Sequence, residues 1–316
     1  MSEISKLDYE QQISHLCNRG VTFNHISKDD ALVYLKDKNS FFRLKSYCKN
    51  FDFNEKTKKY VNLDFAYLVD LATIDMHLRR VMIDISLLIE HYLKMELSST
   101  INLDPHEDGV CIVENFFISY PKVKDMLYRS KSSLGSGDIL NKYLDKIAYW
   151  HLLELLTFGQ FANFYRFYFK SKGIRNKNLA YLNSIQSIRN ASAHNVCLLN
   201  SIRKPYKVYK LEEGVLVENV LYKNSELTSY ISKLGYNRET RETMLGNPIV
   251  HDFLSSILLF SKICKEDKSK QYISNKITDL FNVRMVKNSL YYQKNKKIID
   301  TYKFTNKVIE SIFEVE

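Results

Sequence analysis

The chain has 316 residues, of which 45% are hydrophobic and 13% aromatic, so it can build a core and is neither a disordered nor a collagen-like protein. Its 9 glycines and 4 prolines make up about 4% of the residues, against roughly 12% in average proteins, which disfavours turn-rich sandwiches, barrels and Rossmann-type folds. Lysine and arginine outnumber aspartate and glutamate by 46 to 36, and this net charge of +10 is compatible with a polyanionic partner.

The first third predicts three short helices and one long one. Ser27, followed by two aspartates, is a helix-capping signature, and Asn62 is the expected cap of the long helix. Within the long segment apolar residues recur every three or four positions, and Asp75–Arg79 forms an i,i+4 pair that we expect to be buried as an ion pair. The predicted helices cover residues 8–18, 28–35, 40–50 and 63–100.

The rest of the chain alternates helices with two breaks and one strand-like segment. Residues 103–109 and the Ser/Gly-rich residues 130–138 are predicted loops, and further helices are expected over 138–149, 150–170 and 178–194. Valines at alternating positions around Gly214 predict a β-hairpin within 205–223, and helices resume at Ser225. The predicted fold is therefore all-α, with N-terminal helices, a small β-hairpin insertion and a basic helical C-terminal extension. We divide it into 1–205 and 206–316.

Cysteine spacing and apolar run lengths exclude several classes of site. The five cysteines are at least 31 residues apart, and no Cys/His cluster has zinc-site spacing, so we predict no metal and no cofactor. The first ten residues lack a signal-peptide pattern, which favours the cytoplasm and reduced thiols. The apolar run 253–264 is about half a membrane span, and no membrane association is expected.

The positive charge is concentrated in two blocks. Residues 117–177 carry a net charge of +7 and residues 262–307 a net charge of +8, whereas residues 1–116 are net negative. Basic side chains neutralise phosphates and aromatic rings stack on bases, so the blocks suit single-stranded RNA. The alternative is a solubilising surface with its aromatic residues in the core. The candidate RNA-binding residues are Lys170, Lys172, Arg175, Lys177, Lys294, Lys296 and Lys297.

One short segment carries a set of residues suited to RNA cleavage. Arg189, Asn190 and His194 lie at the end of a predicted helix, and we expect Arg189 and His194 to project to the same side. Arginine can hold a phosphate with two hydrogen bonds, and histidine can transfer a proton near neutral pH. These groups are sufficient for attack of a ribose 2′-OH on the adjacent phosphorus without a metal, giving a 2′,3′-cyclic phosphate and a 5′-OH.

The spacing alone leaves a structural alternative open. Arg19 and His25 also fit an Arg-x(4–6)-His pattern, but Gly20 interrupts the helix between them. In the structural alternative Arg189 pairs with a carboxylate, His194 caps the helix and Asn190 is a plain cap residue. The small residues Ala191–Ala193, which leave room for an RNA backbone, favour the functional interpretation.

Five segments, in order, resemble blocks of a known family. They are Lys6-Leu7-Asp8-Tyr9-Glu10-Gln11-Gln12-Ile13 with Arg19-Gly20; Ala31–Leu35 followed by Phe41-Phe42-Arg43-Leu44-Lys45-Ser46-Tyr47; Leu71-Ala72-Thr73-Ile74-Asp75-Met76-His77-Leu78-Arg79 with Ile89-Glu90; Tyr149-Trp150 with Leu156-Thr157-Phe158-Gly159; and Arg189-Asn190 through His194-Asn195, then Asn200. Together, over roughly residues 5–205, they resemble the Abi family of bacterial abortive-infection proteins (the AbiD/AbiF type), a branch of the HEPN superfamily.

The resemblance implies a HEPN-like helical bundle, RNA as substrate or ligand, and a role in phage defence. HEPN nucleases usually build one site from two Arg-x(4–6)-His motifs, one per protomer, so a homodimer is implied. The chain departs from the family pattern at Ile74, Lys94 and Tyr149, and Val196 stands where some relatives have a modifiable tyrosine.

Two function hypotheses follow. The first is a metal-independent endoribonuclease of HEPN type in anti-phage defence, with Arg189, Asn190 and His194 as the catalytic residues. The second is a non-catalytic RNA-binding protein that forms a complex with a small noncoding, antitoxin-like RNA. A protein–protein scaffold is a third option if neither RNA binding nor cleavage occurs.

Overall fold

The computed structural model describes residues 6–130, 135–143, 145–202, 208–212, 214–219 and 224–314. Within these ranges almost all regular structure is helical, which confirms the all-α prediction. The strands form two small antiparallel hairpins, β1 (Phe53–Asn54) with β2 (Lys59–Tyr60) and β3 (Val208–Glu212) with β4 (Val215–Asn219). The second hairpin confirms the one predicted from the valine pattern, and the first was not predicted.

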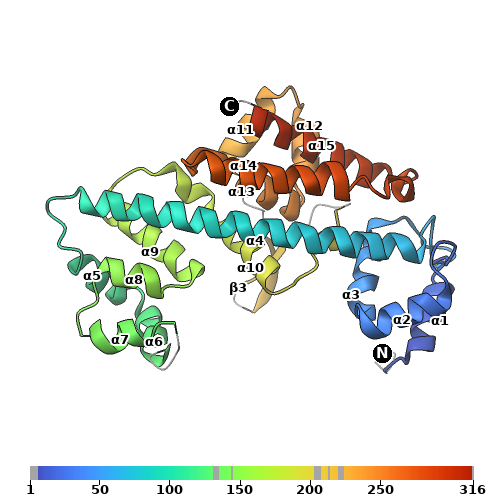
Figure 1. The fold of residues 1–316 in the computed structure, drawn as a ribbon, viewed down its shortest axis with the longest axis horizontal. Coiled ribbons are helices and arrows are strands. Elements are labelled where there is room, and N and C mark those ends of the chain that lie inside the picture. The colour runs from blue at the N-terminus through green and yellow to red at the C-terminus, as the bar shows by residue number, and fades with distance from the viewer. Residues whose placement is uncertain are drawn as a thin grey trace.

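One helix, α4 (Phe65–Asn102), runs through the whole molecule (Figure 1). Its 38 residues contain neither glycine nor proline, so nothing interrupts the backbone hydrogen bonds. Asp64 caps the helix, because its carboxylate accepts the Ala66 N–H at 3.0 Å. The expected cap, Asn62, lies two residues earlier in a left-handed conformation (φ 52°), so that prediction was wrong.

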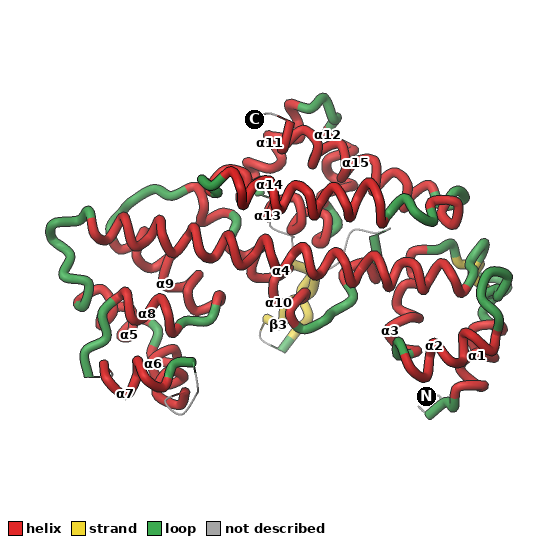
Figure 2. Tube along the Cα trace, viewed as in Figure 1, coloured by secondary structure: helices red, strands yellow, loops and turns green. Residues whose placement is uncertain are grey.

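Most of the other helices form three groups around α4, and α9 and α10 lie between the first two of these groups (Figure 1). α1–α3 lie near its N-terminal end and α5–α8 near its C-terminal end, while α11–α15 cover the opposite side (Figures 1 and 2). The helices are α1 (Tyr9–Asn18), α2 (Lys28–Asp37), α3 (Phe41–Ser46), α5 (Cys111–Ser119), α6 (Pro121–Arg129), α7 (Gly137–Tyr143), α8 (Tyr149–Leu155), α9 (Phe158–Ser171), α10 (Leu182–Ala193), α11 (Ser225–Lys233), α12 (Arg238–Leu245), α13 (Pro248–Ile263), α14 (Asp267–Thr278) and α15 (Lys296–Glu314).

Several boundaries differ from the predicted ones for local reasons. The predicted helix 150–170 is two helices, because Thr157 begins a new helix in which Gln160 Oε1 accepts both the Thr157 N–H and its hydroxyl. The predicted helix 178–194 is a 3₁₀ turn (Lys177–Ala180) followed by α10. The predicted helix 138–149 ends at Tyr143, and α5 and α6 were not predicted.

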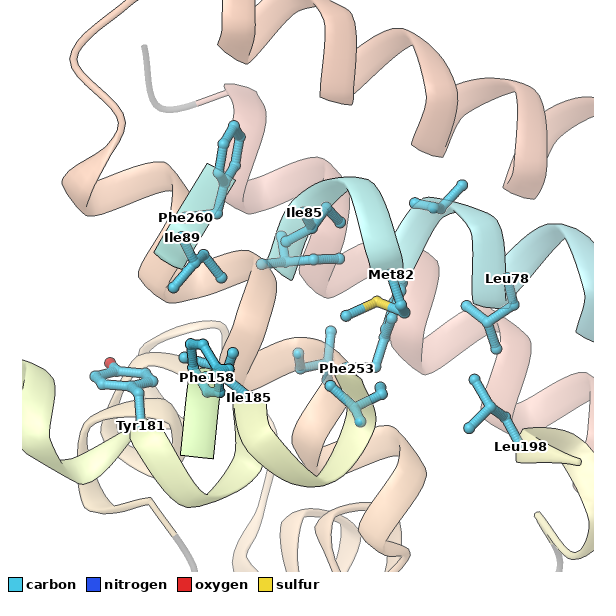
Figure 3. Close-up of a cluster of buried hydrophobic side chains, with 14 of the residues drawn as sticks. Leu78, Met82, Ile85, Ile89, Phe158, Tyr181, Ile185, Leu198, Phe253 and Phe260 are labelled. Carbon is cyan, nitrogen blue, oxygen red and sulfur yellow. The ribbon is translucent and has the colours of Figure 1, made fainter. Parts of the chain in front are cut away.

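The core is built where α10 and α13 pack against the middle of α4. Figure 3 shows buried side chains of these three helices in contact, among them Met82 and Ile85 of α4, Ile185 of α10 and Phe253 of α13. Every residue from Val250 to Phe260 is buried. The division into 1–205 and 206–316 stays a prediction, but a helix of the second part lies at the centre of the molecule.

The structure also shows the state of the cysteines and whether a helix could span a membrane. All five cysteines are free. Among the ranges given above, none of the helices combines the length and the apolar character that a membrane span requires.

Candidate functional site at the end of helix α10

The three predicted catalytic residues lie where α10 ends. His194 is the C-terminal cap, and Asn195 follows in a left-handed conformation (φ 57°). The Asn195 N–H donates to the Ser192 carbonyl (3.2 Å) and the Val196 N–H to the Ala191 carbonyl (2.8 Å), which is a Schellman turn with asparagine in the place that glycine usually takes. The turn leaves His194 exposed at the tip, while Arg189 and Asn190 are half-buried.

The three residues are linked through Asn190. Residues five apart on an α-helix lie about 140° apart around its axis, so helical spacing alone does not bring Arg189 and His194 to the expected common side. Arg189 Nη1 instead donates to Asn190 Oδ1 (3.2 Å), and the Asn190 carbonyl accepts the His194 backbone N–H (2.9 Å). Within the described chain no hydrogen bond joins Arg189 to His194, and Arg189 has no carboxylate partner. His194 therefore caps the helix, as the structural alternative expects. The ion pair of Arg189 that this alternative also expects is not found among the described residues.

Two arginines hold the chain that follows His194. Arg43 of α3 donates through Nη1 to the Asn195 carbonyl (2.6 Å), and Arg79 of α4 through Nη1 to the Val196 carbonyl (3.5 Å). Hydrogen bonds to charged donors are the stronger kind, so these contacts fix the turn in position. The position of His194 thus depends on residues from two other helices.

A buried carboxylate organises these arginines. Asp75, fully buried, forms an ion pair with Arg79 and lies 3.6 Å from Arg43 Nη2, which confirms the predicted Asp75–Arg79 pair. It also accepts the Tyr47 hydroxyl (3.0 Å) and the Leu199 N–H (2.7 Å). Burial raises the pKa of Tyr47, which keeps its hydroxyl a donor. We call Arg43, Tyr47, Asp75 and Arg79 the Asp75 cluster.

Asn50 completes the support of residues 195–202. Its side chain donates to the Leu199 carbonyl (2.6 Å) and accepts the Ile202 N–H (2.8 Å). Its own carbonyl accepts a hydrogen bond from Asn295 Nδ2 (2.8 Å), just before α15. Sequence analysis did not identify Asn50, and its position at the end of an aromatic helix gives no signal of this role.

The Thr157-Phe158-Gly159 segment at the start of α9 also lies against α10. Gly159 faces the end of the Gln186 side chain of α10, since a Cβ at this position would lie 2.7 Å from Gln186 Nε2. Phe158 is buried beside it. This block therefore positions α10 by packing.

The family comparison matches the part of the chain that carries these contacts. The family model described as "Abi-like protein" matches residues 34–200, which are 167 of the 316 residues. The chain belongs to the Abi-like protein family. No curated protein and no solved structure matches it. The matched range of this Abi-like protein holds α10, His194 and the whole Asp75 cluster, and it ends before α11–α15.

The two basic blocks of the Abi-like protein lie at different distances from this site along α4. The second block is tied to the helix at Asp70, which accepts the Tyr292 hydroxyl (2.6 Å), and Asp70 is five residues, or about 8 Å, from Asp75. The first block is tied to it at Glu96, which accepts a hydrogen bond from Asn176 (3.0 Å). Glu96 is 17 residues beyond Arg79, about 26 Å along the axis.

The candidate RNA-binding residues are not equally available. Lys172 forms ion pairs with Asp104 (2.7 Å) and Glu107 (2.8 Å), and these hydrogen bonds raise its pKa. The remaining six are exposed and form no ion pair among the described residues; they are Lys170, Arg175, Lys177, Lys294, Lys296 and Lys297. The aromatic residues Phe164, Tyr165 and Tyr168 of the first block are buried, so they belong to the core and not to a stacking surface.

A Ser–His–Asp set elsewhere in the Abi-like protein is structural. His251 Nδ1 lies 2.9 Å from Asp252 and 3.4 Å from Ser184, and all three residues are buried. His251 Nε2 accepts the backbone N–H of Asn224 (3.0 Å), so neither ring nitrogen is available to take a proton from Ser184. The set joins α10, α11 and α13, and it does not form a hydrolase site.

Proposed function

We propose that this Abi-like protein is a metal-independent endoribonuclease of HEPN type, close to the AbiD/AbiF branch, that acts in abortive-infection defence. Family membership points to that defence role. The observation that carries the enzymatic part is the exposed α10 terminus, where His194 and the Arg189–Asn190 pair precede a segment that the Asp75 cluster holds rigidly. A backbone fixed in this way is one part of the preorganisation that catalysis of RNA cleavage requires.

The proposed chemistry assigns one role to each residue. His194 takes the proton of the ribose 2′-OH or returns one to the leaving 5′-oxygen, and its exposure lets a substrate reach it. Arg189 neutralises charge on the phosphate, and its bond to Asn190 limits the rotamers of the guanidinium. The P–O5′ bond breaks as the 2′-oxygen bonds to phosphorus.

A homodimer would complete the site. Because Arg189 and His194 lie about 140° apart around the axis of one α10, we propose that two copies share the site. Two α10 ends facing each other would bring the Arg189 of one protomer toward the His194 of the other. The net charge of +10 disfavours such a contact unless a polyanion lies between the protomers, which RNA would provide.

The product ends test the proposal directly. We expect the purified protein to cleave single-stranded RNA in the presence of EDTA and to leave 2′,3′-cyclic phosphate and 5′-OH ends. The ends are identified by whether the downstream (3′) product, which carries the new 5′-OH, accepts phosphate from a polynucleotide kinase without prior dephosphorylation. Cleavage that needs Mg²⁺, or that leaves 5′-phosphates, would contradict the mechanism.

A second function is favoured by one observation. In the part of the chain that the structure describes, the His194 imidazole has no hydrogen-bond partner to orient it, although catalytic histidines usually have one. We therefore retain a non-catalytic RNA-binding protein that holds a small noncoding RNA as the alternative. It predicts co-purified RNA of defined sequence that the protein leaves intact.

The position of the two basic blocks gives a length-dependent prediction for RNA binding. Because the second block lies nearer the site, K294E/K296E/K297E should weaken binding of an RNA of about eight nucleotides, whereas K170E/R175E/K177E should weaken only longer RNAs. The two triple variants change the net charge equally, so each is the control for the other.

Fluorescence anisotropy at several salt concentrations measures this difference. The slope of log K against log salt is negative, and loss of three phosphate contacts should make it less steep by about 2 for a single strand. Equal losses in both variants on the short RNA would contradict the placement of the RNA near α10.

A further inference from the structure

An apolar cavity lies beside the candidate site. Its volume is about 350 Å³, and it is enclosed by α4, α13, α15 and the π-helical turn Asp279–Arg284 with the chain after it. This volume lies in the range of sites that hold small molecules. Residues that line it are Leu71, Leu78, Leu199, Ile202, Phe253 and Phe281.

Three of the four hydroxyl groups on the inner wall of the cavity are already hydrogen-bonded. The Tyr292 hydroxyl donates to Asp70 (2.6 Å), the Tyr302 hydroxyl to the Phe281 carbonyl (3.2 Å), and the Thr301 hydroxyl to the Lys297 carbonyl (2.8 Å). The fourth, the hydroxyl of the buried Thr305, makes no hydrogen bond among the described residues. A ligand that entered would therefore meet a predominantly apolar surface. This favours a hydrocarbon over a sugar, a nucleotide or a peptide.

The rim of the cavity has the opposite character. Ser289, Gln293 and Lys303 line it and are exposed, and none of the three has a side-chain hydrogen bond or ion pair among the described residues. Lys296 and Lys303 lie three residues before and four residues after Ile299, which also lines the cavity, so both amines project along the same stripe of α15. The rim is thus cationic, without a carboxylate that pairs with Lys303.

We propose that this cavity binds a single-chain anionic amphiphile, a medium-chain carboxylate, with the hydrocarbon chain inside and the carboxylate at Lys303. Charge complementarity at the rim and the apolar lining select this occupant together. Each methylene that leaves water contributes to binding, and the exposed amine adds orientation more than affinity.

The ligand would contact the chain that supports the catalytic turn. Leu199 and Ile202 line the cavity with their side chains, while their backbones are held by Asp75 and Asn50. An amphiphile in the cavity therefore touches the segment that begins at His194. The consequence for RNA cleavage rests on the proposed function, but binding itself does not.

Calorimetry with dodecanoate, below the concentration at which it forms micelles, tests binding on the full chain. We expect saturable binding of one dodecanoate per chain, with affinity that falls about fourfold for each methylene removed down to octanoate. Absence of saturable binding, or affinity that does not depend on chain length, would overturn the proposal.

Two variants locate the ligand. Ile299→Trp fills the cavity and should abolish binding. Lys303→Glu should weaken dodecanoate by about three- to tenfold and leave the neutral dodecan-1-ol unaffected. Lys307→Glu is the matched control, because Lys307 lies over the Tyr236 ring, one turn further along α15 and outside the cavity. Equal effects of the two glutamate variants would overturn the assignment of the rim, even if Ile299→Trp failed to fold.

Hydrogen exchange separates this inference from the proposed function. Dodecanoate should slow exchange in peptides that cover Leu199–Ile202 and residues 279–293, and it should leave α5–α7 unchanged. This readout needs no RNA and no activity, so a protein that never cleaves RNA can still support or refute the cavity site. Slowed exchange in α5–α7 alone would place the ligand elsewhere and refute it.

Discussion

Replacing His194 by alanine is expected to reduce RNA cleavage by about 10²- to 10⁴-fold, the usual contribution of a general acid or base. The free energy of unfolding of the His194→Ala variant should stay within about 0.5 kcal/mol of that of the unsubstituted protein, because the His194 side chain is exposed and only its backbone takes part in the turn. The loss would therefore be chemical and not structural. Single-turnover cleavage and urea unfolding measure the two quantities on the same preparation.

His106 provides the matched control. It is also exposed, and the contact that it makes is a backbone N–H to Asp104 (3.0 Å). His106→Ala should cleave RNA at the rate of the unsubstituted protein. If His194→Ala, purified in the same way, has lost cleavage, a contaminating nuclease is excluded. Persistent cleavage by His194→Ala would refute the assignment, as would an equal loss in both variants.

Removal of the Asp75 carboxylate is expected to have the largest effect on stability. Asp75→Ala should lower the free energy of unfolding by about 3–5 kcal/mol, because it leaves the buried Arg79 guanidinium without its partner. The Leu199 N–H and the Tyr47 hydroxyl would also lose their acceptor. Urea unfolding monitored by circular dichroism gives the difference.

A second carboxylate on the same helix tests whether burial is the cause. Asp84 forms an ion pair with Lys276, but both side chains are about one-third exposed. Asp84→Ala should therefore cost no more than about 1 kcal/mol. If Asp75→Ala cost no more than Asp84→Ala, the Asp75 cluster would not be what holds residues 195–202.

The helices were largely predictable because their signals are local. Apolar residues at three- and four-residue spacing in α4, the Ser27 cap of α2 and the valine alternation of the hairpin each depend on neighbours in sequence. The errors arose where competing local signals were close together. Two candidate caps lie two residues apart at Asn62 and Asp64, and Thr157 restarts a helix inside a continuous apolar run.

The site could be predicted only in part. Arg189, Asn190 and His194 were singled out because they lie within six residues, and their catalytic role stays a prediction; the common side expected for Arg189 and His194 ignored that five residues is not a whole number of helical turns. The contacts that fix the turn join residues more than a hundred positions apart, as from Arg43 to Asn195 and from Asp75 to Leu199. Which carbonyl a buried arginine meets depends on helix packing, and no local pattern encodes it.

The central place of α13 limits what the family region can do by itself. The matched residues 34–200 supply α4 and α10, yet the faces by which these two helices contact α13 would be left open to water without the last third of the chain. The segment that defines membership therefore relies on α13, a helix outside it, to cover the core faces of α4 and α10.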